Sequence, residues 1–219
     1  MDSSNMLENP GALSTPPVVL PKRHIIKYFI PFLVIAIVSG AIDLSTKTYV
    51  FHLLGDPLSS PDRKLDIIKG LLEFENKMNN GIIWGFFQSA NVLLLILVSL
   101  LAVPLIVLIF FFTAVPKEAT SLKGLKIRWL STISLGFILG GAFGNLFDRF
   151  YYGGVRDFIH YYYLLDWPTF NMADGFISVG VILMIITLFR KEAFEETEML
   201  QQDKTPDIQA PQDQVTVPK

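Results

Sequence analysis

Several aspartates stand close together in the second half of the chain, among them Asp148, Asp157 and Asp174. Asp148 and Asp157 each have an arginine as a direct neighbour, whereas Asp174 is an isolated charge in a long apolar stretch. A protonated carboxyl group beside an ionised one can divide the roles of general acid and general base between two like side chains. The aspartates are therefore candidates for acid–base catalysis, and their spacing is also compatible with a proton relay or with structural ion pairs.

Other groups that carry chemistry are missing from the sequence. There is no cysteine, which excludes disulfides, thiolate metal sites and cysteine nucleophiles. The three histidines, His24, His52 and His160, are too far apart in the sequence to form a ligand cluster on one helix. HExxH, phosphate-loop and Gly-x-Ser-x-Gly motifs are also absent. We therefore expect no metal and no cofactor.

The composition is typical of a membrane protein. Only 17% of the 219 residues are charged, against roughly 25% in an ordinary soluble domain, and the mean hydropathy is +0.45. Both ends of the chain are acidic, so the apolar middle is basic. A basic, apolar segment favours a membrane as partner and argues against nucleic acid.

Four apolar stretches divide the chain. Because a bilayer-spanning helix needs about 20 residues, they predict helices over about 25–53, 89–115, 127–148 and 170–190. The helices form one membrane domain over residues 22–191, and the polar, proline-containing segments 1–21 and 192–219 are expected to be disordered tails. The first stretch is also compatible with a cleavable signal peptide, an interpretation that the polar leader before it disfavours.

The basic residues predict how the helices are oriented. They gather before the first helix, between the second and the third, and after the fourth, where Arg190 and Lys191 stand. Cytoplasmic links carry the excess of Lys and Arg in membrane proteins. We therefore expect both tails to be cytoplasmic and the links 54–89 and 148–173 to lie on the outer side.

Polar side chains from three helices are expected at one depth near the outer surface. A span of about 20 residues places Asp43, Asn145 and Asp174 about one turn below that surface. Ionisable groups at such a depth usually line a cavity or a pathway. Asp43 and Lys47 stand one helical turn apart, so that they can form a stabilising pair.

Glycines recur every four residues in the third predicted helix, at Gly136, Gly140 and Gly144. Such a stripe of small residues allows a second helix to approach closely. We therefore expect these glycines to serve helix packing.

Three functions are compatible with these residues. A site with two catalytic aspartates predicts that substitution of the aspartates abolishes the reaction. A proton-coupled transporter, in which Asp43, Asp148 and Asp174 relay protons, predicts a pH-driven flux. A noncatalytic scaffold that assembles through the glycine stripe predicts tolerance of the aspartate substitutions.

A series of motifs resembles one family closely. Gly140–Arg149, Gly154–Phe158 and Phe170–Asp174 are similar, in this order, to the motifs of lipoprotein signal peptidase, also called signal peptidase II. Upstream, Asp43–Lys47 is similar to the family's Asp-x-x-x-Lys, and Asn79–Gly85 is similar to its Asn-x-Gly-x-x-Phe-Gly. The resemblance extends from the first predicted helix to the last.

The resemblance implies an all-α membrane protein of four transmembrane helices, with a small β-rich extracytoplasmic cradle between helices one and two. The link 148–173 would cover the site. The implied activity is that of an aspartyl endopeptidase of the bacterial cytoplasmic membrane. It would remove signal peptides from diacylglyceryl-modified prolipoproteins by cutting before the lipidated cysteine. Its partners would be these substrates and membrane lipids, and we expect a monomer.

The roles of single residues follow from the matching motif positions. By this resemblance, Asp157 and Asp174 look like the catalytic pair, and Asp43 with Lys47 looks like a structural pair. The residues that would support the catalytic pair or bind substrate are Asn145, Arg149, Asn171 and Asn79.

Several positions depart from the pattern of the family, among them Ile82–Trp84, which replace smaller residues and a phenylalanine. Gly175 stands where a serine commonly follows the second aspartate, and Arg156 stands before Asp157 where an aliphatic residue is usual. An adjacent positive charge lowers the pKa of a carboxyl group. Arg156 is therefore expected to lower the pKa of Asp157 and to favour it as the ionised partner.

Overall fold

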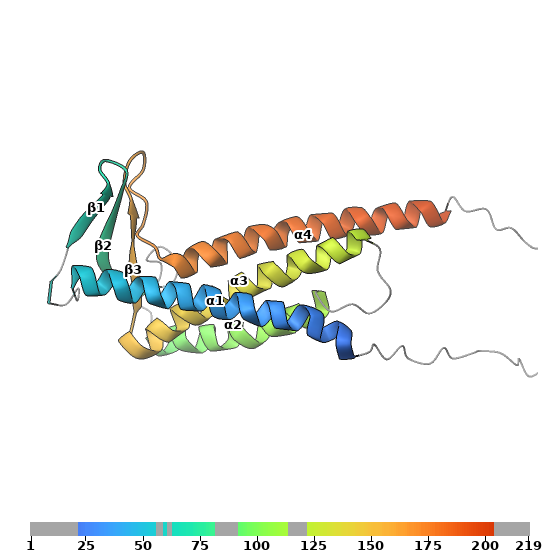
Figure 1. The fold of residues 1–219 in the computed structure, drawn as a ribbon, viewed down its shortest axis with the longest axis horizontal. Helices are drawn as coiled ribbons and strands as arrows, with labels where there is room; N and C mark the ends of the chain where they lie inside the picture. The colour runs from blue at the N-terminus through green and yellow to red at the C-terminus, as the bar shows by residue number, and fades with distance from the viewer. Residues whose placement is uncertain (1–21, 56–58, 61–62, 82–91, 114–121, 204–219) are drawn as a thin grey trace, which may run out of the picture.

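The computed structural model describes residues 22–55, 59–60, 63–81, 92–113 and 122–203. The elements follow in the order α1 (Lys22–Leu54), β1 (Lys64–Ile68), β2 (Leu72–Asn79), α2 (Val92–Thr113), α3 (Leu122–Tyr152), β3 (Val155–Tyr161) and α4 (Met172–Asp203). The helices run along the long axis of the molecule, and a small sheet lies at one end of them (Figure 1). This architecture confirms the predicted helical membrane protein with a small β-rich part.

Each of the four helices contains a segment that is long and apolar enough to cross a membrane. These segments are Ile25–Leu54, Leu93–Thr113, Leu125–Tyr152 and Met172–Arg190. They agree with the predicted helices to within a few residues, because a continuous apolar run is a strong signal for a spanning helix. The helices alternate in direction, so that α1 begins and α4 ends at the end of the bundle opposite the sheet (Figure 1).

Helix α4 is longer than predicted. It continues to Asp203, beyond the predicted end at residue 190 and into a segment for which the sequence predicts disorder. Residues 192–203 are rich in Glu, Gln, Met and Leu, which are strong helix formers, and the first proline after Arg190 is Pro206. Polarity alone therefore does not end the helix. The other tail residues, 1–21 and 204–219, lie outside the described residues.

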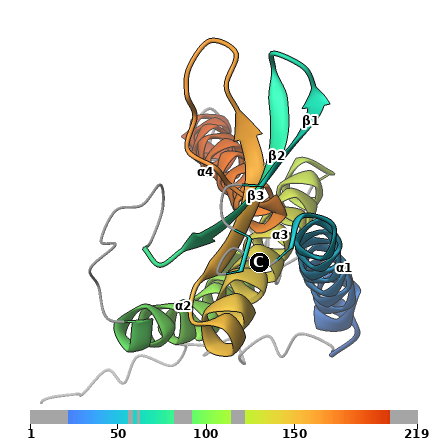
Figure 2. The same cartoon turned by 90° about the vertical axis from the view of Figure 1, so that its left-hand side faces the viewer.

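Helix α3 lies at the centre of the bundle and packs against α1, α2 and α4 (Figure 2). Its contact with α1 runs along Gly136, Gly140 and Gly144. A Cβ atom on Gly140 would lie 2.5 Å from the carbonyl oxygen of Ala36, and one on Gly144 would overlap the carboxylate of Asp43. The glycine stripe therefore faces a helix of the same chain, and it allows the two backbones to approach closely.

The three strands form an antiparallel sheet in the order β1-β2-β3. Strands β1 and β2 come from the link between α1 and α2, as predicted, whereas β3 comes from the link between α3 and α4. Phe158 of β3 packs against Val50 and Leu54 at the end of α1. The sheet thus joins two links that are far apart in the sequence, and it fixes the strand that carries Asp157 at the end of the bundle.

Candidate active site

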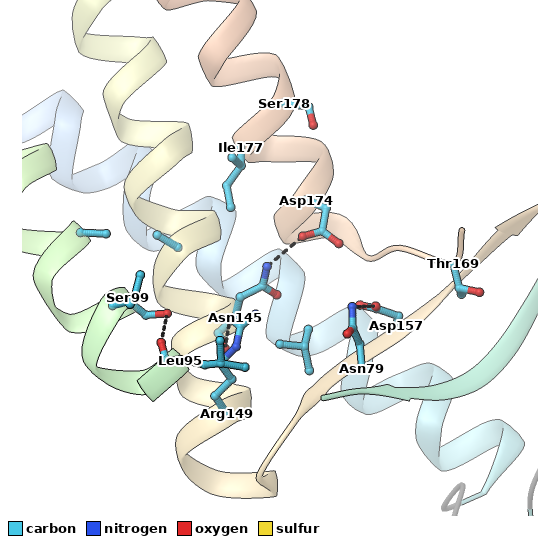
Figure 3. A pocket seen from close by; sticks show the side chains of 14 residues that line it. Asn79, Leu95, Ser99, Asn145, Arg149, Asp157, Thr169, Asp174, Ile177 and Ser178 are labelled. Atoms are coloured by element: carbon cyan, nitrogen blue, oxygen red, sulfur yellow. Dashed lines mark hydrogen bonds between the residues drawn. The ribbon is translucent and has the colours of Figure 1, made fainter. Parts of the chain in front are cut away.

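Asp157 lies near the start of β3 and is only 2% exposed. Its Oδ2 accepts a hydrogen bond from Nδ2 of Asn79 at 2.9 Å, and its Oδ1 accepts one from Nδ2 of Asn171 at 2.6 Å. Asn79 is the last residue of β2, and it pairs with Val155 of β3. The pairing of the two strands therefore brings the amide of Asn79 to the carboxylate (Figure 3).

Asp174 lies in the first turn of α4, and Asn171 caps this helix. Oδ1 of Asn171 accepts a hydrogen bond from the backbone N–H of Asp174 at 3.0 Å, and Oδ2 of Asp174 accepts one from the backbone N–H of Asn171 at 3.3 Å. This reciprocal arrangement is a capping box, built here from Asn and Asp. It holds the carboxylate at the N-terminus of the helix, where the helix dipole favours a negative charge.

Two amides connect the two aspartates. Nδ2 of Asn145 donates to Oδ1 of Asp174 at 2.9 Å. Nδ2 of Asn171, which donates to Asp157, also donates to Oδ1 of Asn145 at 3.2 Å. The carboxyl groups of Asp157 and Asp174 are therefore held by one hydrogen-bonded unit, which joins α3, β3 and the start of α4. Figure 3 shows the hydrogen bond between Asn145 and Asp174 in this unit.

The surroundings of Asp157 change its affinity for a proton. Burial and, after it, the negative charge of Asp174 raise the pKa of Asp157 to about 7. The hydrogen bonds from Asn79 and Asn171 and the positive charge of Lys47 act in the opposite direction. Near neutral pH this carboxyl group can therefore both hold and release a proton, as a general acid or base must.

Arg156, the neighbour of Asp157 in the sequence, has a different partner. Successive residues of a strand point to opposite faces of the sheet. The Nη2 and Nε groups of Arg156 donate to Oδ1 of Asp148 at 2.8 and 3.1 Å, and its backbone N–H donates to Oδ2 at 3.0 Å. The expectation that Arg156 lowers the pKa of Asp157 is therefore wrong, since Arg156 neutralises Asp148 and the pKa of Asp157 is raised.

A cluster of four buried charges adjoins the aspartate pair. Nζ of Lys47 lies 2.7 Å from Oδ2 of Asp43 and 3.2 Å from Oδ2 of Asp148, which in turn pairs with Arg156. None of these four side chains is more than 5% exposed. Two acids and two bases balance one another, as buried charges must. This arrangement disfavours a proton relay through Asp43 and Asp148, because both carboxylates are locked in ion pairs.

A cavity of about 260 Å³ opens beside the aspartate pair. Its polar lining includes five side chains predicted to form the site, Asn79, Asn145, Arg149, Asp157 and Asp174. Its apolar lining comes mostly from three helices and includes Leu95, Val98, Ala142 and Ile177. Figure 3 shows the apolar residues on α2 and α4 at one end and Asp157 at the other. A cavity of this kind suits a ligand that has both a polar and an apolar part.

Arg149 retains an unused donor at the cavity. Its Nη1 and Nη2 donate to the backbone oxygens of Asn145 and Gly81 at 3.3 and 3.2 Å. Its Nε is buried and has no hydrogen-bond partner in the part of the chain that the structure describes. A buried donor without a partner is costly. A carbonyl oxygen of a bound ligand would remove this cost.

Outside the aspartate pair, the structure places His160 beside two acids. Its ring nitrogens and the carboxylates of Glu73 and Glu75 offer ligand atoms within 4.8 Å of one another. The spacing of the histidines in the sequence does not show this group, because the two glutamates come from the neighbouring strand β2. Lys64 forms ion pairs with both glutamates. An ammonium group therefore lies where a metal cation would have to bind.

One part of the site has a recognisable sequence signal and another has none. Asn171 stands three residues before Asp174 and ahead of an apolar run, which is the pattern of a helix N-terminus. Thr169, by contrast, lines the cavity and forms a hydrogen bond with Glu75. Nothing in the sequence around Thr169 indicates either contact, because both depend on tertiary structure.

The chain is similar to one family along most of its length. Residues 35–190 match the family described as signal peptidase (SPase) II. The lipoprotein signal peptidase of Clostridium novyi is 35% identical over 161 residues, which cover 72% of this chain and 97% of that relative. The lipoprotein signal peptidase of Clostridium tetani is 34% identical over 169 residues, with 76% and 97% covered.

Solved structures share the fold. A bacterial membrane enzyme determined by the in meso method at 2.3 Å resolution is similar with a TM-score of 0.60 and 24% identity, over 74% of this chain and 88% of that chain. A second bacterial membrane enzyme, determined by the same method at 1.9 Å, gives a TM-score of 0.56 and 25% identity, over 72% and 91% of the two chains. The arrangement of helices and sheet is therefore that of known membrane enzymes.

Proposed function

The chain belongs to the signal peptidase II family of membrane proteases, which remove signal peptides from lipoproteins, and we propose that it works as an aspartic-type endopeptidase. The observation that carries this proposal is the aspartate pair. Asp157 and Asp174 come from different elements, share one unit of amides, and adjoin a cavity with an apolar wall. The sequence contains no cysteine that could act as a nucleophile instead.

In the proposed reaction one aspartate is protonated and the other is ionised. The raised pKa of Asp157 favours it as the protonated partner, which leaves Asp174 as the base. Asp174 accepts a proton from water while the water oxygen attacks the scissile carbonyl carbon, and Asp157 donates a hydrogen bond to the carbonyl oxygen. When the tetrahedral intermediate collapses, the C–N bond breaks and the leaving nitrogen takes a proton from the pair. The products are a carboxylate on the signal peptide and a free amine on the lipoprotein.

Arg149 and Asn79 are proposed to position the peptide and the acid. The buried Nε of Arg149 is available to a substrate carbonyl oxygen, which it would bind with a charge-assisted hydrogen bond. Asn79 donates a hydrogen bond to one oxygen of Asp157 and thereby fixes the orientation of its carboxyl group. Neither residue exchanges a proton with substrate in this scheme.

The proposed substrates are diacylglyceryl-modified prolipoproteins, which are cut before the lipidated cysteine. The apolar lining of the cavity from α2, α3 and α4 supports this choice, since it offers acyl chains a place beside the reacting bond. The names of the relatives, lipoprotein signal peptidases, point to the same substrate class.

We further propose that the protein is a monomer in the bacterial cytoplasmic membrane with both tails on the cytoplasmic side. The positive charges at the start of α1 and at the end of the fourth apolar segment support this orientation. The sheet, which carries Asp157, and the start of α4, which carries Asp174, would then lie near the outer leaflet, because both occupy the opposite end of the helices (Figure 1).

Cleavage by the purified protein tests the proposed function. In detergent micelles we expect a diacylglyceryl-modified prolipoprotein to lose its signal peptide, which gel electrophoresis and mass spectrometry detect. The same prolipoprotein without the diacylglyceryl group serves as the matched control, and we expect its cleavage to be at least about 100-fold slower, since it lacks the apolar contacts of about 0.8 kcal/mol per buried methylene. Absence of cleavage, or cleavage elsewhere than before the cysteine, would refute the proposal.

The rate of cleavage should depend on the protonation of Asp157. Its pKa of about 7 lies above the usual value for an aspartate, so that the carboxyl group keeps its proton below about pH 7 and loses it as the pH rises. If Asp157 is the acid, kcat/KM falls as the pH is raised through this value. A profile of kcat/KM from pH 5 to 9 measures this. A rate that instead increases through pH 7 would make Asp157 the base and reverse the two proposed roles.

A further inference from the structure

Lys47 contacts more than its ion-pair partners. Its ammonium group, which has three donors and no acceptor, lies 2.7 Å from Oδ2 of Asp43, 3.2 Å from Oδ2 of Asp148 and 2.9 Å from Oδ1 of Asn145. The side chain is fully buried. The third contact is not needed for neutralisation, because Arg156 already balances the second acid of the cluster.

We infer that Lys47 is a positioning residue of the aspartate pair, which acts by fixing the orientation of the Asn145 amide. An amide presents an oxygen on one side and an NH₂ group on the other, and the two have nearly the same shape. Because an ammonium group only donates, Asn145 must turn its oxygen toward Lys47. Its Nδ2 then points to Asp174, to which it donates at 2.9 Å.

The orientation of Asn145 also determines how Asn171 faces Asp157. Oδ1 of Asn145 accepts from Lys47 and also from Nδ2 of Asn171, at 2.9 and 3.2 Å. Asn171 therefore has its NH₂ group on the side of Asp157, to which it donates at 2.6 Å, and its oxygen on the backbone N–H of Asp174. A reversed Asn145 would face NH₂ with ammonium and oxygen with carboxylate, two repulsive contacts. The buried charge of Lys47 thus determines, throughout the hydrogen-bonded unit, which end of each amide donates and which end accepts.

The charge of Lys47 also affects the protonation of Asp157. It lowers the pKa of Asp157, in opposition to burial and to Asp174. The other charges around the two groups are Asp43 on α1, Asp148 and Arg149 on α3, Arg156 on β3 and Lys77 on β2, which stands opposite Asp157 in the strand register. Loss of the ammonium group is therefore expected to raise the pKa of Asp157 above about 7.

The inference rests on the proposed function and is tested with the whole protein on a diacylglyceryl-modified prolipoprotein. Lys47→Met alone leaves a buried acid unbalanced, so the decisive variant is Asp43→Asn/Lys47→Met, which removes one acid and one base. The matched control, Asp148→Asn/Arg156→Met, removes the other acid and base of the cluster and leaves Lys47 on Asn145. Thermal unfolding, kcat, KM and the pH profile are measured for both variants and for the wild type.

We expect kcat of Asp43→Asn/Lys47→Met to fall about 10- to 100-fold, as it does when reacting groups are slightly misplaced, with little change in KM. The alkaline decline of its rate should begin at a higher pH than in the wild type. Asp148→Asn/Arg156→Met should keep kcat within about threefold and keep the wild-type pH profile, whatever its melting temperature.

The results distinguish the proposed function from the role of Lys47. A wild-type protein that does not cleave the substrate refutes the proposed function itself. If the wild type cleaves, equal kcat values and equal pH profiles for the two double variants would overturn the role of Lys47. Failure of Asp43→Asn/Lys47→Met to fold, where the control folds, would assign Lys47 to folding alone and would overturn it as well.

Discussion

Asp157→Asn and Asp174→Asn are each expected to reduce cleavage of a diacylglyceryl-modified prolipoprotein by at least about 1,000-fold, since a positioned acid or base contributes roughly 100- to 10,000-fold. Asparagine has the shape of the aspartate but neither gives up nor accepts a proton at neutral pH. The two groups act as one unit in the proposed reaction, so the double variant should be little slower than either single variant. Rates of purified proteins, measured by the release of the signal peptide, check these values.

The substitutions should leave the protein folded. Asparagine keeps one oxygen, which can accept the hydrogen bond that Asn171 donates to each aspartate. It loses only the acceptor that faces Asn79 or Asn145. Asp166→Asn is the matched control, because Asp166 lies between the two aspartates, in the link from β3 to α4, with an exposed side chain, and it does not line the cavity. We expect full activity from the control. Wild-type turnover by a folded Asp157→Asn or Asp174→Asn variant would exclude the proposed mechanism.

The helical part of this fold can be predicted from the sequence because its signals are local. A run of about 20 apolar residues has few alternatives to a spanning helix. The pair Asp43 and Lys47 follows from helical spacing in the same way, and the structure contains this ion pair. The extension of α4 to Asp203 could not be predicted, because the helix propensity of residues 192–203 favours a helix whereas their polarity indicates disorder.

The contacts of β3 could not be predicted, because they depend on which strands pair. Asn79 and Asp157 meet only through the register of β2 and β3. The partner of Arg156 depends on which face of the strand it occupies, and adjacency in the sequence suggested the wrong one. His160 likewise finds its partner Glu73 on the neighbouring strand. Side chains on strands therefore need the tertiary structure before a charge can be assigned to its partner.

The choice between Asp148 and Asp157 shows what the structure adds to a resemblance between motifs. Asp148 lies near the end of α3 and Asp157 follows this helix, and both have an arginine beside them in the sequence. In the structure Asp148 accepts hydrogen bonds from Arg156 and lies in an ion pair with Lys47, whereas the partners of Asp157 are neutral amides. A buried carboxyl group that has no cation in contact with it favours its protonated form, which the proposed acid must have. The difference between the two aspartates is therefore electrostatic.

Gly140→Ala is expected to destabilise the protein by about 3 kcal/mol, the upper end of the usual cost of overpacking. In an open helix the same substitution stabilises by about 1 kcal/mol, because alanine has the higher helix propensity. At Gly140, however, the new Cβ atom would lie 2.5 Å from the carbonyl oxygen of Ala36 and 3.1 Å from the backbone nitrogen of Gly40. Backbone atoms cannot move aside alone, so α1 and α3 must separate.

The matched control is Gly175→Ala in α4, where a Cβ atom would meet nothing within 4 Å. The two substitutions add the same methyl group to a membrane helix, so propensity acts equally in both and their difference isolates the contact between α1 and α3. Thermal unfolding in detergent should show a lower melting temperature for Gly140→Ala and an equal or higher one for Gly175→Ala. Because α1 also carries Asp43 and Lys47, separation of the helices would disturb Asn145 as well. Equal melting temperatures would mean that the glycine stripe does not hold α1 against α3.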